Sequence, residues 1–345
     1  MKELKNLALA TLGKVKSDFS MEDANTALRG EIEKLICDET GKRSRHAYNR
    51  NKETLFELME ETIDEILPIR VEQIFGQFAE TQVLAQGQKA SFAKKLGRMR
   101  GKAFVTTVSP AGTYEAFRLD RERFDVAVGA IGGAARVDWE RFLDGLDDMN
   151  ELVDIVMEGM EEAIYKAVYT QLIAAHNNIA MPDANVANAA GFVQSAMDRI
   201  IAVVKAYGSE AVIFCTPLFA SKISNEISRL GYGFISQADV EAIRTQGYVG
   251  LYKGTPVVVL PISLTDENNT TWAYDPSYAF VMPTGKEKVV KLIFEGATQI
   301  RDVENIDWSM EMQVYKKFGT AMLYYNNWGI YHDTELSTTV GSAKS

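Results

Sequence analysis

Residues 147–176 read DDMNELVDIVMEGMEEAIYKAVYTQLIAAH and form the most regular stretch of the chain. Apolar residues recur there at steps of three and four, from Met149 to Leu172, which is the spacing of one buried helical face. A helix of this length would span roughly 45 Å, which is long for a compact domain. We therefore predict one long helix, from about Asp147 to His176, around which the rest of the fold is organised.

The first half of this predicted helix is strongly acidic. Residues 144–162 contain eight acids and no base, more than the helix dipole or an N-terminal cap requires. A metal or acid–base group is disfavoured, because neighbouring residues on a helix point in different directions. We predict a solvated or partner-facing stripe. Its candidate contact residues are Asp147, Asp148, Glu151, Asp154 and Glu158.

A basic hairpin precedes the helix. Glycines punctuate short alternating runs in residues 87–125, and the sequence SPAG at 109–112 predicts a turn between two strands. The first limb, residues 89–102, has six bases, no acid and a single aromatic residue, so it offers no stacking array for nucleic acid. The bases are Lys89, Lys94, Lys95, Arg98, Arg100 and Lys102. We predict that they meet acids on a neighbouring copy, in a repeating contact that propagates into rings or lattices.

The flanking segments are less regular. Residues 1–86 are polar and mostly helical in pattern, with an apolar stripe at 55–67 before Pro68, and we interpret them as an extended or loosely packed arm. Residues 124–128 are predicted as a strand. The glycine cluster at 129–135 lacks both the GxGxxG and the GK[ST] pattern, so we interpret it as a flexible hinge. An α/β unit at 188–262 follows, in which Thr216-Pro217 predicts the start of a helix. The final block is rich in strand formers, and the clean alternation at 308–315 predicts a strand.

Composition narrows the function classes. The chain has 345 residues, 46% hydrophobic and 24% charged, with a net charge of −10. Such a chain can bury a substantial core, and its acidity argues against a protein whose main task is to grip nucleic acid. No apolar stretch reaches the length that spans a membrane, so no membrane association is expected.

The residue types that usually carry chemistry are sparse. Cys37 and Cys215 lack disulfide or zinc spacing and are predicted to be small buried hydrophobes. His46, His176 and His332 lie in different segments, so a catalytic triad or a metal cluster would require distant parts of the chain to meet. We expect no enzyme activity, no cofactor and no metal. A soluble hydrolase built on residues 188–262 remains an alternative, although the GxSxG elbow is missing.

The order of these parts resembles a tailed-bacteriophage major capsid protein with the Hong Kong 97 (HK97) fold. The similarity includes the polar arm, the glycine-punctuated hairpin, the long helix, the α/β unit, the segment GTPV at 254–257 and the strand-rich end. The resemblance implies an α+β capsid fold. Its parts are an N-terminal arm with leading helices (1–86), an extended loop (87–123), a peripheral domain with a spine helix (124–180), an axial domain (181–290), peripheral long strands (291–318), and a C-terminal return strand and tail (319–345).

The resemblance also implies the partners. Copies of the chain would form the pentamers and hexamers of an icosahedral shell around double-stranded DNA of a tailed phage or prophage. The DNA would contact the inner face without sequence specificity. Only 86 residues precede the hairpin, so a fused prodomain is expected to be absent and a separate scaffolding protein, or none, is implied. A portal and a decoration protein are further expected partners. The location is the virion capsid, assembled in the host cytoplasm. An encapsulin-type nanocompartment is the main alternative.

Overall fold

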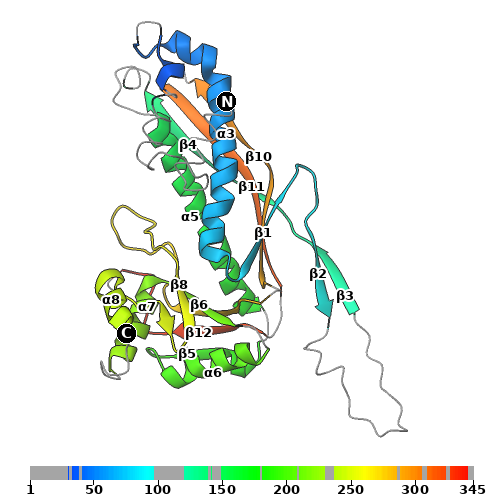
Figure 1. The fold of residues 1–345 in the computed structure, drawn as a ribbon, viewed down its shortest axis with the longest axis vertical. Coiled ribbons are helices and arrows are strands. Elements are labelled where there is room, and N and C mark those ends of the chain that lie inside the picture. Colours follow the sequence, from blue (N-terminus) through cyan, green and yellow to red (C-terminus); the bar gives the residue numbers. More distant parts are fainter. Residues whose placement is uncertain are drawn as a thin grey trace.

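The structure is a computed structural model that describes residues 30, 33–38, 41–96, 120–138, 141, 149–178, 181–207, 210–229, 237–285, 288–304, 309–323 and 327–340. The described chain is α+β, with two larger sheets and a two-stranded ribbon (Figure 1). One sheet has the order β1-β10-β11-β4, the other β5-β12-β9-β6-β8-β7, and the ribbon pairs β2 with β3. No helix in the described ranges is both long enough and apolar enough to cross a membrane.

The four-stranded sheet carries two long helices on one face, side by side along the long axis of the molecule (Figure 1). Helix α3 packs on β10, and α5 packs on β4 and β11. The elements are α3 (Arg45–Phe75), β1 (Ala79–Leu84), β4 (Gly129–Asp138), α5 (Met149–Asn178), β10 (Val290–Glu304) and β11 (Ser309–Met322). β1 runs parallel to β10, whereas β10, β11 and β4 are antiparallel neighbours.

Helix α5 confirms the predicted long helix to within two residues at each end. Its apolar stripe lies in the core that fills the space between sheet and helices, and Met160, Ile164 and Leu172 are at most 2% exposed. Because α5 also contacts Phe280 of the second sheet, and Tyr274 in the segment before β9, through Tyr169, it connects the two halves of the molecule.

Helix α3 corrects the interpretation of residues 45–75 as a loosely packed arm. The apolar stripe continues past Pro68, which lies inside the helix, through Val71 to Phe75. Proline removes one intrahelical hydrogen bond and normally ends or kinks a helix. Here Leu67, Val71 and Phe75 are fully buried around it. Tertiary burial on both sides of Pro68 accounts for the uninterrupted helix.

Strand β4 corrects the prediction of a flexible hinge at 129–135. These residues pair with β11 in continuous antiparallel register, from Gly129 opposite Phe318 to Asp138 opposite Ser309. Gly132 has a packing role, because a Cβ there would lie closer to the Val314 carbonyl oxygen than real Cβ atoms approach. The strand predicted at 124–128 corresponds to the end of β3 (Asp120–Asp125), which stops at Asp125, three residues earlier than expected.

The six-stranded sheet holds the second half of the core, and helices α6, α7 and α8 lie around it (Figure 1). Strand β6 is completely buried at its centre, and Thr216-Pro217 begins α7 as predicted. The C-terminal strand β12 inserts between β5 and β9. The elements are β5 (Val186–Ala189), α6 (Gln194–Ala206), β6 (Ala211–Cys215), α7 (Pro217–Arg229), α8 (Gln237–Gln246), β7 (Leu251–Tyr252), β8 (Thr255–Val259), β9 (Tyr278–Pro283) and β12 (Gly329–Asp333), with a 3-10 turn at Asp183–Asn185.

Candidate functional site

The predicted basic hairpin is an antiparallel ribbon of β2 (Ser91–Leu96) and β3 (Asp120–Asp125) that projects sideways from the four-stranded sheet (Figure 1). Apolar contacts hold the base of the ribbon. Ala90 and Phe92 pack against Ile293 of β10, and all three are at most 6% exposed. The Lys291 ammonium lies 5.2 Å from the centre of the Phe92 ring and forms an ion pair with Glu80. The sheet therefore fixes the base of the ribbon, and the predicted turn at 109–112 lies outside the described residues.

The strand register places one base of the first limb opposite an acid of the second limb. Lys94 is directly opposite Glu122, while Lys95 is opposite Arg121. Lys89 precedes β2 and is exposed. The side chains of Lys94 and Lys95, together with Arg98, Arg100 and Lys102, lie outside the described part. The sequence interpretation considered the first limb alone, although the acids of the second limb could have been read from the same stretch.

The acidic stripe divides into two parts. Glu158 is exposed on α5, and its contact with a partner stays a prediction. Two later acids of the same run have partners within the chain. Glu161 forms an ion pair of 2.7 Å with Arg70 of α3, and Glu162 accepts a hydrogen bond from the Ser263 hydroxyl. Glu151 and Asp154 belong to α5, but their side chains are outside the described residues, as are Asp147 and Asp148. Among described residues, no ion pair joins the ribbon's bases to this stripe.

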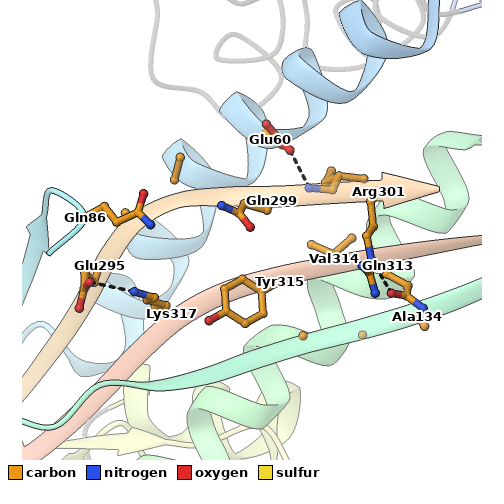
Figure 2. A pocket seen from close by; sticks show the side chains of 15 residues that line it. Glu60, Gln86, Ala134, Glu295, Gln299, Arg301, Gln313, Val314, Tyr315 and Lys317 are labelled. Atoms are coloured by element: carbon orange, nitrogen blue, oxygen red, sulfur yellow. Dashed lines mark hydrogen bonds and ion pairs between the residues drawn. The ribbon is translucent and has the colours of Figure 1, made fainter. Parts of the chain in front are cut away.

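A groove of 930 Å³ lies on the sheet face beside β4 (Figure 2). Its floor includes the bare backbone of Gly132 and Gly133, and Tyr315 stands in its middle, 40% exposed. An ion pair of 3.0 Å between Lys317 and Glu295 closes one end. Sequence reasoning missed the groove because five separate segments build it.

A bulge in β10 shapes this groove. The pairing of β10 with β11 shifts between Glu295 and Gln299, and Gly296 takes a φ of +70°, which favours glycine. Asp64 of α3 accepts hydrogen bonds from the Thr298 backbone N–H at 2.9 and 3.1 Å. It also pairs with Lys316 of β11, whose side chain is 1% exposed. The bulge is thus held by the Asp64 carboxylate of the helix together with the buried ammonium of Lys316 from the neighbouring strand.

Two of the three histidines come from distant segments and lie near one another. The rings of His176 and His332 are both close to the ring of Tyr278, whereas His46 is exposed on α3. Among the described residues, no group of three His, Cys, Asp or Glu side chains is arranged to hold a metal ion. Cys215 is fully buried, which raises the pKa of its thiol, and Cys37 is only partly buried.

Comparison with known proteins gives a family and a fold. The family model described as "SPbeta prophage-derived putative capsid protein YonB" matches residues 1–332. No curated protein matches the chain.

Among solved structures, the capsid of a native GTA particle has a TM-score of 0.54 at 12% identity, over 75% of this chain and 89% of that chain. The capsid of cyanophage P-SCSP1u has a TM-score of 0.52 at 12% identity, over 75% and 88%. The mature capsid of bacteriophage PhiM1 gives 0.50 at 12% identity, over 76% and 87%. At such identity, these likenesses establish the fold.

Proposed function

Because the chain belongs to the YonB family of prophage-derived capsid proteins, we propose that its copies form the pentamers and hexamers of an icosahedral shell enclosing double-stranded DNA. The observation that carries this proposal is the ribbon. β2 and β3 extend from the sheet, and the buried cluster around Phe92 anchors their base. A two-stranded ribbon is at best marginally stable by itself, so we infer that a second copy covers it.

The coarser conclusions follow from the family and the fold. The protein is a structural, non-enzymatic major capsid protein with an α+β, HK97-like fold, which self-assembles into a shell and is located in the virion capsid. The family match therefore overturns the hydrolase alternative.

The domain boundaries are part of the proposal. The sheet of β1, β10, β11 and β4 with α3 and α5 supports a peripheral domain, and the six-stranded sheet supports an axial domain around the five- or six-fold axis. β1, from the arm region, would then belong to the peripheral sheet. β12, from the C-terminal region, would belong to the axial sheet.

Charge has a specific part in the proposed contact. The exposed Lys89 and the other bases of the ribbon would face acids of the spine helix α5 on a neighbouring copy, with Glu158 as the exposed representative. An exposed ion pair contributes only about 0–1 kcal/mol, so charge would set register and specificity while apolar burial supplies affinity. Glu161 and Glu162 are excluded from this role by their partners within the chain.

The remaining partners are proposed from the capsid function. A net charge of −10 suits a shell wall that does not bind phosphate tightly, so packed DNA would stay mobile against it. A scaffolding protein, a portal and a decoration protein would complete assembly, which would take place in the host cytoplasm. Strong, salt-sensitive DNA binding by free subunits would contradict the proposed inner wall.

Charge reversal on the ribbon tests the proposed contact. The triple variant Lys94→Glu, Lys95→Glu and Arg98→Glu is expected to reduce assembly, followed by light scattering and electron microscopy. The matched control exchanges bases at the same positions, Lys94→Arg, Lys95→Arg and Arg98→Lys, and should assemble normally. Unchanged assembly of the charge-reversed variant would refute the contact. Purified particles that contain protein cargo instead of nucleic acid would support the encapsulin-type alternative.

A further inference from the structure

The base of the ribbon rests on the face of the four-stranded sheet that lies opposite the helices (Figure 1). Leu292 and Phe294 of β10 belong to the core that α3 and α5 share, whereas Lys291 and Ile293 alternate with them and point to the other face. Phe92 packs against Ile293 there, and the Lys291 ammonium lies over the Phe92 ring. Strand β10 therefore meets the ribbon with one apolar and one charged side chain.

Lys291 is an unfavourable residue for this place. Its side chain is 6% exposed and contacts the apolar cluster through the Phe92 ring. Taking an ammonium out of water costs free energy that an ion pair offsets only in part, and an apolar side chain of similar length would fill the space at less cost. Its partner, Glu80 of β1, is 40% exposed and also accepts the Gln82 amide at 3.0 Å. A gain in stability does not account for a lysine here.

The charged contact is directional, whereas the apolar one is not. Burial of Phe92 against Ile293 depends on the area removed from water. A cation is attracted to the face of an aromatic ring and not to its edge. The Lys291 ammonium lies 5.2 Å from the ring centre and is bound from the side of β1 by Glu80. These side chains thus fix the direction in which the Phe92 ring faces, and with it the orientation of β2.

Another contact fixes the point at which the chain leaves the sheet. The Gly87 backbone N–H donates to the Glu295 carboxylate at 3.0 Å, and Glu295 pairs with Lys317 at 3.0 Å. One point of attachment sets the position of an arm, and a further point along the arm is needed to set its direction. Phe92 lies five residues beyond Gly87 and supplies that point.

We propose that Lys291 is a positioning residue that sets the direction in which the ribbon leaves its own subunit, through the Phe92 ring and the counter-charge of Glu80. This inference rests on the proposed contact between the ribbon and a neighbouring copy, and it adds that the ribbon is oriented before that copy arrives. A segment already fixed in its bound direction loses less conformational freedom on association. The joint therefore favours assembly without any new contact between copies.

Distances within the unassembled full chain test the joint. Double electron–electron resonance between spin labels at Asp120, at the far end of β3, and at Glu57, exposed on α3, reports the direction of the ribbon. The background is Cys37→Ser, and the other native cysteine is buried. Asp120 lies four residues beyond Phe124, the cross-strand partner of Phe92. This is a lever of roughly 13 Å, so a swing of about 20° displaces the label by about 4 Å.

Lys291→Met keeps the length of the side chain and removes its charge. We expect the distance distribution to widen by about 4 Å and assembly, followed by light scattering, to slow. The urea midpoint should stay close to that of wild type, because Glu80 still reaches water. Lys291→Arg keeps the cation and should give the wild-type distribution. Lys288→Met is the matched control, since it removes a lysine of the same region that binds the Gly76 oxygen, and it should leave the distribution unchanged.

The distance distribution decides the outcome. An unchanged distribution in Lys291→Met overturns the proposal whatever the urea midpoint does, since a purely structural lysine would alter stability alone. If Lys291→Met folds poorly, Phe92→Leu takes its place: it keeps apolar burial on Ile293, removes the ring face and should widen the distribution, and an unchanged distribution there also overturns the proposal. Wider distances with unchanged assembly would support the joint and contradict instead the proposed contact of the ribbon with its neighbour.

Discussion

The buried pair of Lys316 and Asp64 gives the sharpest test of how the peripheral sheet is held together. The Lys316 ammonium is 1% exposed and is bound by Asp64 and, at 2.9 Å, by the Gly296 carbonyl oxygen. Asp64 is 27% exposed and also accepts the Thr298 N–H in the β10 bulge. The two partners differ in their access to water, so removing one should not cost the same as removing the other.

Asp64→Ala leaves a buried cation without its counter-charge and the Thr298 N–H without its acceptor. Breaking a buried pair in this way costs about 3–5 kcal/mol, and the partial exposure of Asp64 places this pair near the lower limit. We therefore expect a loss of about 3 kcal/mol in the free energy of unfolding. Lys316→Met keeps the buried volume and leaves an aspartate that still reaches water and Thr298, so its expected loss is about 1 kcal/mol.

Urea denaturation of the full chain, followed by circular dichroism at concentrations without assembly, measures both values. Glu57→Ala, at an exposed position of the same helix, is the control and should change stability by less than about 0.5 kcal/mol. The double variant Asp64→Ala, Lys316→Met should be more stable than Asp64→Ala alone, because no unpaired cation remains. The explanation is wrong if Lys316→Met lowers the free energy of unfolding more than Asp64→Ala does. It is also wrong if the double variant is no more stable than Asp64→Ala alone.

Two further predictions concern the strands. Gly132→Ala should weaken the β4–β11 pairing and lower the urea midpoint of unfolding, because its Cβ collides with the Val314 carbonyl oxygen. Gly133→Ala is the matched control, since its Cβ would make an ordinary contact of 3.7 Å with Val156. Equal urea midpoints for the two variants would contradict this explanation. At the base of the ribbon, burial opposes ionisation of Glu80, but its hydrogen bond and ion pair with Lys291 outweigh burial and lower its pKa. The contribution of this carboxylate is present at neutral pH and is lost as pH falls through the lowered pKa. Acid should therefore increase hydrogen exchange in segment 79–96, and in Lys291→Met the increase should be smaller; an equal increase would exclude the pair as its cause.

Local patterns in the sequence predicted much of the fold. The apolar repeat of residues 147–176 was sufficient for α5, because a stripe at steps of three and four has one stable solution, a helix buried on that side. The alternating end of the chain indicated β11, and Thr216-Pro217 indicated the start of α7. The glycine-punctuated stretch at 87–125 indicated a hairpin, and β2 pairs with β3 as its two limbs.

Other features depended on residues distant in sequence. Pro68 stays inside α3 because the sheet and α5 bury the residues around it, and residues 129–135 form a strand because β11 supplies their hydrogen bonds. The groove at Tyr315, the bulge bound by Asp64 and the meeting of His176 with His332 likewise join segments more than one hundred residues apart. Periodicity records which side of a segment is buried, whereas the identity of the partner is set by packing in three dimensions. The tertiary structure alone therefore decided where charges are neutralised, which glycines must remain glycine and which histidines can influence one another.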